Sequence, residues 1–417
     1  MKKILNRLLS FFNTIKSKIA FYPTFMAIAG FGLAIAMMAV EAEGISNYLL
    51  EIVPMFTLSD GGTVISLLTV CIGGLISMMV FSFSMVMLLL SQASNNFSPR
   101  ILPGLISDRR HQIILGVYLG SILYMIFTLL SIEKEDIGAS LPQLSILLGI
   151  LFTIFSFGAF INFIHTISQS IQISNILDRI SNQALKRLNK IIETETASGS
   201  IAKSSFEEAE GWHSYSAGKS GYLQNISITN LVNLAIRNKL KIYITVPKGL
   251  FVLPEAELVK INQKVDEEII QEIVSNISFS RDELIEDNYT LAFKQITEIV
   301  LKAMSPGIND PGTALNALDY LTELFALRMQ KLDNDLFYDD GNPIVKHKTV
   351  DFEKLLTNIM SSLLTYCSKD PIVVQKMHWM LSYLVNRKAA KPNYHEVVKR
   401  EFEKMNKLVK KLEKENA

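Results

Sequence analysis

Four polar side chains are spaced three, four and three residues apart at the end of an apolar run, and they are Asn162, His165, Gln169 and Gln172. On an α-helix this spacing places all four on one face. Polar side chains are costly against lipid, so they are expected to face water or other helices. The pattern indicates a helix face that lines an ion or solute pathway near the cytoplasmic leaflet, where His165 can titrate near neutral pH. Two alternatives stay open: hydrogen bonds to neighbouring helices, or a helix that has already left the bilayer there.

Three arginines, Arg100, Arg109 and Arg110, gather in one loop between two apolar runs. Guanidinium groups bind phosphate well, so this loop can contact lipid headgroups, a nucleotide or acidic residues of the polar half of the chain. The alternative is that the arginines set the membrane topology and form salt bridges.

A sharp loop is indicated by Ser305, Pro306, Asn309, Asp310 and Pro311. Asp310 fits the N-cap of a following helix, and Pro311 fits its first helical position. Backbone N–H groups at a helix start can also bind an anion, but the Asp310 carboxylate is expected to take that place. We therefore expect a structural loop.

Common catalytic and metal-binding patterns are missing from the sequence. There is no HExxH, Walker A, kinase, nucleophile-elbow or CxxC motif. Four histidines lack ligand spacing, namely His213, His347, His378 and His395. The net charge of +1 provides no global field that favours nucleic acid. We expect no enzyme activity, no metal, no cofactor and no nucleic-acid partner.

Membrane helices are the elements that would position these residues. Four apolar runs contain no Lys, Arg, Asp or Glu, and they cover about 21–40, 64–90, 113–132 and 144–164. Each is near or above the roughly 20 residues that a helix needs to cross hydrocarbon. Basic residues gather in the N-terminal tail and in the loop after the second run, which predicts that both termini are cytoplasmic.

Small and hydroxyl side chains follow one face of the second run, and they are Ser66, Thr69, Gly73, Ser77 and Ser84. Small residues let helices approach closely, so the pattern favours helix packing. A pore-lining face is the alternative.

The remaining chain divides by composition. Residues 1–19 predict an amphipathic helix on the inner membrane surface, and 20–178 predict the four-helix transmembrane domain. We expect a helix extension and linker at 179–218, a small α+β module at 219–262, and a helical cytosolic domain at 263–417. The expected fold class is a membrane α-helical protein with four transmembrane helices, plus a mostly α cytosolic domain with a small β module.

Several stretches carry a family resemblance. They read Asn-Phe-Ser-Pro-Arg at 96–100, Phe-Ile-His at 163–165, Ser-Gly-Tyr-Leu-Gln at 220–224 and Ser-Pro-Gly-Ile-Asn-Asp-Pro at 305–311. In this order, over nearly the whole chain, the sequence resembles the uncharacterised bacterial predicted-membrane-protein family called domain of unknown function 2254. The resemblance implies a bacterial inner-membrane protein with the topology given above, and it implies no activity.

The sequence therefore favours a bacterial inner-membrane protein that forms or regulates an ion or small-solute pathway. The fourth helix would line the pathway, and the cytosolic half would gate or assemble it. Expected partners are the lipid bilayer and further copies of the chain, because one chain offers few partners for four polar side chains. The alternative is a membrane-anchored sensor or scaffold whose cytosolic domain binds a partner.

Overall fold

The computed structural model describes residues 21–43, 60–96, 109–132, 141–170, 172–198, 206, 211–280 and 288–415. The expected amphipathic helix at 1–19 and Arg100 lie outside these residues. The chain forms two compact units, an N-terminal unit at Met1–Gln172 and a C-terminal unit at Ile173–Ala417.

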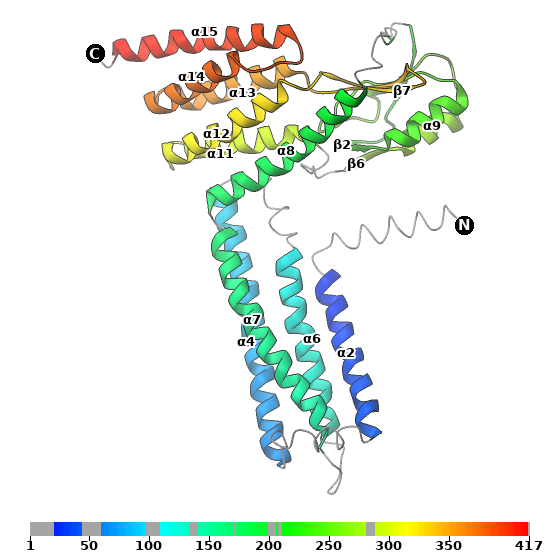
Figure 1. The fold of residues 1–417 in the computed structure, drawn as a ribbon, viewed down its shortest axis with the longest axis vertical. Helices are drawn as coiled ribbons and strands as arrows, with labels where there is room; N and C mark the ends of the chain where they lie inside the picture. The colour runs from blue at the N-terminus through cyan, green and yellow to red at the C-terminus, as the bar shows by residue number, and fades with distance from the viewer. Residues whose placement is uncertain are drawn as a thin grey trace. The chain divides into compact units, whose positions relative to one another are not determined.

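The N-terminal unit is a bundle of long apolar helices (Figure 1). They are α2 (Phe21–Ala42), α4 (Gly61–Asn96), α6 (Arg109–Ile132) and α7 (Gln143–Ser170). Within the described residues, these four helices are long and apolar enough to cross a membrane, which confirms the predicted number. In its most apolar stretch α6 is 50% buried while α2 is 11% buried, so α6 is the central helix.

Glycines bring α2 and α6 into close contact. A Cβ atom added to Gly30 would stand 2.2 Å from the carbonyl oxygen of Gly120, and one added to Gly116 would stand 2.6 Å from Met26 Sδ. Gly116 and Gly120 are four residues apart and therefore share a face of α6, the small-xxx-small spacing that lets membrane helices approach. The sequence analysis did not single out this pair.

Several polar groups inside the bundle are paired through hydroxyl contacts. The Tyr124 hydroxyl donates to the Ser145 carbonyl oxygen at 3.0 Å, and the Ser121 and Ser156 hydroxyl oxygens are 3.4 Å apart. The Ser145 N–H and hydroxyl both donate to the Glu41 carboxylate, at 2.9 and 3.2 Å. Since Ser145 lies in the first turn of α7, this carboxylate satisfies a helix-start N–H group that has no partner within the helix.

Two β-sheets begin the C-terminal unit after α8 (Ile173–Ser198). The larger sheet has the order β1 (His213–Ser216), β5 (Glu257–Ile261), β3 (Ile242–Ile244), β8 (Asn342–Lys348) and β7 (Asn334–Asp339). Only the β3–β8 pair is parallel in this sheet. The smaller, antiparallel sheet has the order β4 (Phe251–Val252), β2 (Gly221–Ile226) and β6 (Ile277–Ser280).

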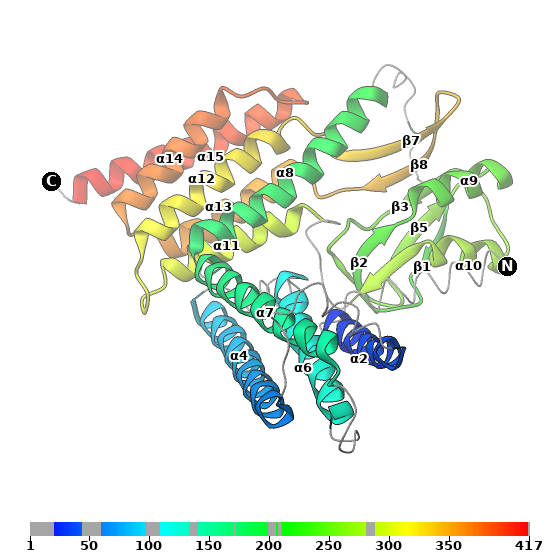
Figure 2. The same ribbon diagram turned by 60° about the horizontal axis from the view of Figure 1, so that its bottom comes forward.

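The sheets share an aliphatic core with two short amphipathic helices, α9 (Ile228–Asn238) and α10 (Glu267–Ser275) (Figure 2). Helix α9 buries Leu231, Leu234 and Ala235, which recur at helical spacing. It ends at Lys239, whose φ of 52° is the left-handed conformation that terminates many helices.

Helices fill the rest of the C-terminal unit. They are α11 (Thr290–Ala303), α12 (Pro311–Arg328), α13 (Phe352–Cys367), α14 (Pro371–Val385) and α15 (Pro392–Glu415). A row of aromatic rings forms their core: the centroids of Phe293 and Phe325 are 4.8 Å apart, as are those of Phe352 and Tyr394. The mostly helical fold with a small sheet confirms the expected fold class.

One hairpin departs from the helical pattern expected for 263–417, and it is formed by β7 and β8. Its turn uses Asp340 and Gly341, whose φ angles of 44° and 82° are both left-handed. Two such residues give a turn whose twist matches antiparallel strands. In β8, Pro343, Val345 and His347 alternate as buried residues, so the period is two and not 3.6.

Candidate functional site

The polar face of α7 points away from its own bundle. Asn162, His165 and Gln169 are exposed, while Phe163 and Ile167 are buried on the opposite side of the helix. The side chains of His165 and Gln169 meet, with 3.1 Å between their Nε2 atoms. The two polar side chains therefore contact each other along the exposed face of the helix.

Gln172 is not part of that helix. Helix α7 ends at Ser170, and the Gln172 N–H donates to the Gln169 carbonyl oxygen at 3.2 Å. The sequence analysis expected one helix to continue past the membrane, but α7 and α8 are separate helices in separate units. The polar face on α7 therefore holds three of the four predicted residues.

The predicted arginine loop is described only at its end. Arg109 and Arg110 are exposed in the first turn of α6, and Arg100 lies outside the described residues. Cations are unfavourable at a helix N-terminus, because the helix dipole is positive there. The helix dipole therefore does not explain why arginines stand there. Exposed arginines next to a membrane helix are instead typical of residues that set the orientation of the helix in the membrane.

The loop 305–311 joins α11 to α12. Asp310 is the N-cap of α12 and accepts a hydrogen bond from the Thr313 N–H at 3.1 Å, with Pro311 at the first helical position. These hydrogen bonds hold the pKa of Asp310 below its ordinary value. Ser305 donates to the Lys302 carbonyl oxygen, Pro306 is exposed, and Asn309 adopts a left-handed φ of 47°. The loop thus ends one helix and starts the next.

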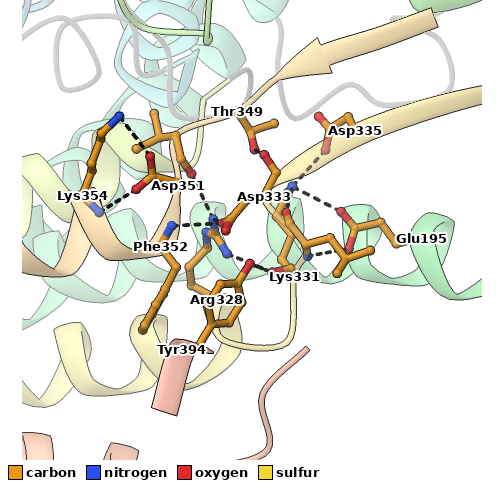
Figure 3. A network of polar contacts seen from close by, with 12 residues as sticks. Glu195, Arg328, Lys331, Asp333, Asp335, Thr349, Asp351, Phe352, Lys354 and Tyr394 are labelled. Atoms are coloured by element: carbon orange, nitrogen blue, oxygen red, sulfur yellow. Dashed lines mark hydrogen bonds and ion pairs between the residues drawn. The ribbon is translucent and has the colours of Figure 1, made fainter. Parts of the chain in front are cut away.

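A buried ion network, which the sequence analysis missed, lies where the helices of the C-terminal unit meet its larger sheet (Figure 3). Two fully buried cations form its centre. Arg328 donates to Asp333 at 2.6 Å and to the Val350 carbonyl oxygen at 2.9 Å. Lys331 contacts Asp335 at 2.9 Å and Glu195 at 3.2 Å.

The network connects elements far apart in sequence. Glu195 lies on α8 and also accepts from the Leu332 N–H at 3.1 Å. His347 of β8 lies 3.4 Å from Asp335 of β7, and the Tyr394 hydroxyl of α15 donates to the Lys331 carbonyl oxygen at 3.2 Å. No spacing rule links these positions, so no signal in a single sequence could have found them.

Burial raises the pKa of each carboxylate in the network, but the net shift differs in direction from one carboxylate to the next. Burial alone would raise the pKa of Asp335, but the hydrogen bond with His347 and the Lys331 charge outweigh it and hold the pKa far below its ordinary value. In the same way the Arg328 bond overcomes burial and lowers the pKa of Asp333. Burial prevails at Glu195 and raises its pKa, although Lys331 opposes it.

Within the described residues, no three His, Cys, Asp or Glu side chains are grouped to hold a metal ion. In the ion network each cation faces a carboxylate, although Arg328 Nε and His347 Nε2 are buried without a hydrogen-bond partner in the part of the chain that the structure describes. Its arrangement fits an internal structural junction better than a reaction centre, because its charges already neutralise one another.

Comparisons with known proteins identify the family. The family described as Predicted membrane protein (DUF2254) matches residues 16–383. The uncharacterized protein Mb1321c of Mycobacterium bovis and the uncharacterized protein Rv1290c of Mycobacterium tuberculosis are each 23% identical over 391 residues, which is 91% of this chain and 74% of the relative. No solved structure matches the chain. With four membrane-spanning helices and a match over most of its length, the chain belongs to the family Predicted membrane protein (DUF2254).

Proposed function

We propose that several copies of this membrane protein assemble around an ion or small-solute pathway lined by the polar face of α7. The observation that carries the proposal is the exposure of Asn162, His165 and Gln169 on a helix that is mostly apolar. His165 and Gln169 contact each other, but an amide and an imidazole have more hydrogen-bonding groups than this one contact uses, and exposing those groups to hydrocarbon is unfavourable. Contact with water or with another copy removes that cost.

Helix α4 supplies a second face with the same character. Its small and hydroxyl residues are exposed on the single chain, and they are Ser66, Thr69, Gly73, Ser77 and Ser84. A Cβ atom added to Gly73 would meet nothing within 4 Å, so this face does not pack within its own bundle. Phe81 of α4 contacts Phe160 of α7 with 5.8 Å between ring centroids, so the two helices are neighbours. Small residues on α4 would let copies approach closely.

In this proposal both termini lie in the cytoplasm of a bacterial cell, and the C-terminal unit gates or assembles the pathway. The basic N-terminal tail and the arginines before α6 support this orientation. The polar face of α7 would then open near the cytoplasmic leaflet.

The test uses thiol labelling. In a chain carrying Cys71→Ser and Cys367→Ala, Cys is introduced singly at the exposed polar positions 162, 165 and 169. The matched controls are Ile164→Cys, next to the polar face, and Phe163→Cys, which is buried in the bundle. A membrane-impermeant thiol reagent should label the three polar positions from the cytoplasmic side and leave both controls unlabelled.

Flux measures function directly. Purified protein carrying His165→Cys in liposomes should conduct K⁺ or chloride, and the thiol reagent should reduce that flux while leaving the Phe163→Cys protein unaffected. Equal labelling of polar and control positions would mean that the helix is outside the membrane there. No labelling at any position would mean dry packing, and the pathway would be replaced by the scaffold interpretation.

A further inference from the structure

The C-terminal unit contains a groove of about 470 Å³ lined by α8, α12 and α14. Figure 2 shows α12 between the other two helices. The volume falls within the roughly 300–1,000 Å³ typical of small-molecule sites. Three half-buried aliphatic side chains, Leu185, Ala326 and Leu327, give the groove an apolar surface.

One end of the groove is cationic. Arg387 and Lys388 line it just after the end of α14. The Arg387 guanidinium lies over the Tyr383 ring, with its central carbon 3.7 Å from the ring centroid. A stacked guanidinium keeps its N–H groups free at the edge, which suits two parallel hydrogen bonds to a phosphate.

These two cations differ from Lys376, the lysine of α14. Lys376 lies over the Trp379 ring at 4.2 Å and forms an ion pair with Asp319 of α12. No carboxylate among the described residues lies within ion-pair distance of Arg387 or Lys388. Their positive charge is therefore available to an anion from outside the chain.

The other residues that line the groove carry polar side chains. Asn189 and Gln330 offer amides that both donate and accept, and Glu323 offers a carboxylate. The Tyr383 ring is already occupied by the Arg387 guanidinium that lies over it and by the Trp379 ring, whose centroid is 5.6 Å away. A planar ligand would therefore lie on the aliphatic side chains and not on the tyrosine.

We propose that this groove binds a nucleoside phosphate. The phosphate would contact Arg387 and Lys388, the base would lie on Leu327 and its aliphatic neighbours, and an amino group of the base would donate to Glu323. The apolar planar body, the anionic head and the amino edge of such a ligand match the aliphatic, cationic and carboxylate side chains that line the groove. The proposal does not depend on a membrane pathway, and it gives the C-terminal unit a ligand of its own.

Tryptophan fluorescence tests the proposal. The sequence has two tryptophans, so Trp212→Phe leaves Trp379, beside Tyr383, as the single reporter. The full chain in detergent is titrated with AMP, with adenosine and with inorganic phosphate, and calorimetry follows the same titrations. We expect saturable AMP binding and weaker binding of each half of the molecule.

Variants make the result specific. Arg387→Gln should weaken AMP binding roughly tenfold to a hundredfold, the effect of losing a charge-assisted hydrogen-bonded pair. Lys399→Gln, an exposed change on α15 outside the groove, should leave AMP binding unchanged. Phosphate binding equal to AMP binding would reduce the site to a simple anion site. Two results would overturn the proposal: no heat and no fluorescence change on adding AMP, or normal AMP binding by the Arg387→Gln protein. Arg387 and Lys388 would then serve only to offset the negative end of the α14 helix dipole.

Discussion

The two units satisfy their buried polar groups by different means. In the N-terminal unit most buried polar side chains carry hydroxyls, such as those of Tyr124 and Ser121, which bond to a carbonyl oxygen or lie close to another hydroxyl. In the C-terminal unit two full charges, Arg328 and Lys331, have 0% of their side chains exposed. Their carboxylate partners Asp333 and Asp335 are 17% and 22% exposed and thus keep contact with water.

The difference follows from the surroundings of each unit. A bundle in lipid gains little from apolar burial, so close backbone approach at Gly30 and Gly120 provides the packing. A unit in water can bury a charge when the partner remains hydrated, since the desolvation cost is then lower than for a fully buried pair. Loss of one partner should therefore be most costly in the C-terminal unit.

The largest expected effect is from Arg328→Leu. Removing the guanidinium leaves Asp333 without its cation and should lower the local free energy of unfolding by about 3–5 kcal/mol. Amide hydrogen exchange of α12 and β7 in the full chain measures this change. Arg400→Leu is the matched control, because Arg400 pairs with Glu353 on the exposed surface, where water screens the charges, and its loss should cost much less. Similar losses in both variants would contradict the comparison.

A smaller effect is expected in the bundle from Gly30→Ala. The added Cβ would overlap the Gly120 carbonyl and should destabilise the contact between α2 and α6 by about 1–3 kcal/mol. Gly32→Ala, two residues along the same helix, meets nothing within 4 Å and should be neutral or stabilising by up to about 1 kcal/mol. Detergent-induced unfolding of the two proteins provides the measurement. If Gly32→Ala is the more harmful change, the glycine contact is not what holds these helices.

The smallest effect is a response to acid confined to the C-terminal unit. Asp333 and Asp335 have lowered pKa values, so the stability they provide is present above about pH 4, the ordinary value for Asp, and is lost as the pH falls further. Glu195 has a raised pKa, so its contribution has the opposite sign and offsets part of the loss.

Hydrogen exchange, corrected for its intrinsic pH dependence, should show reduced protection of β7 between pH 6 and pH 3, with α6 unchanged. In the Glu195→Gln protein the opposing contribution is absent, so the loss should be larger. Equal acid sensitivity of α6 and β7 would remove the distinction between the units.

Local patterns in the sequence determined a large part of this protein. Four charge-free apolar runs predict four membrane helices, since hydrocarbon admits only long segments without charge. The Asp310–Pro311 pair predicts the start of α12, because a cap depends only on residues within one turn. The β-strands on either side of the Asp340–Gly341 turn lie in a stretch that the sequence analysis predicted as helical, so local patterns did not reveal this hairpin.

Only the tertiary structure decided which polar residues meet. The spacing of Asn162, His165 and Gln169 gives their common face, but the packing of α7 decides that this face points away from the bundle. The contact between Glu195 and Lys331 joins residues 136 positions apart by sequence number, and the pairing of β3 with β8 is similarly distant. Such contacts depend on the packing of whole elements through the nondirectional burial of apolar surface, so the single sequence carries no local pattern for them.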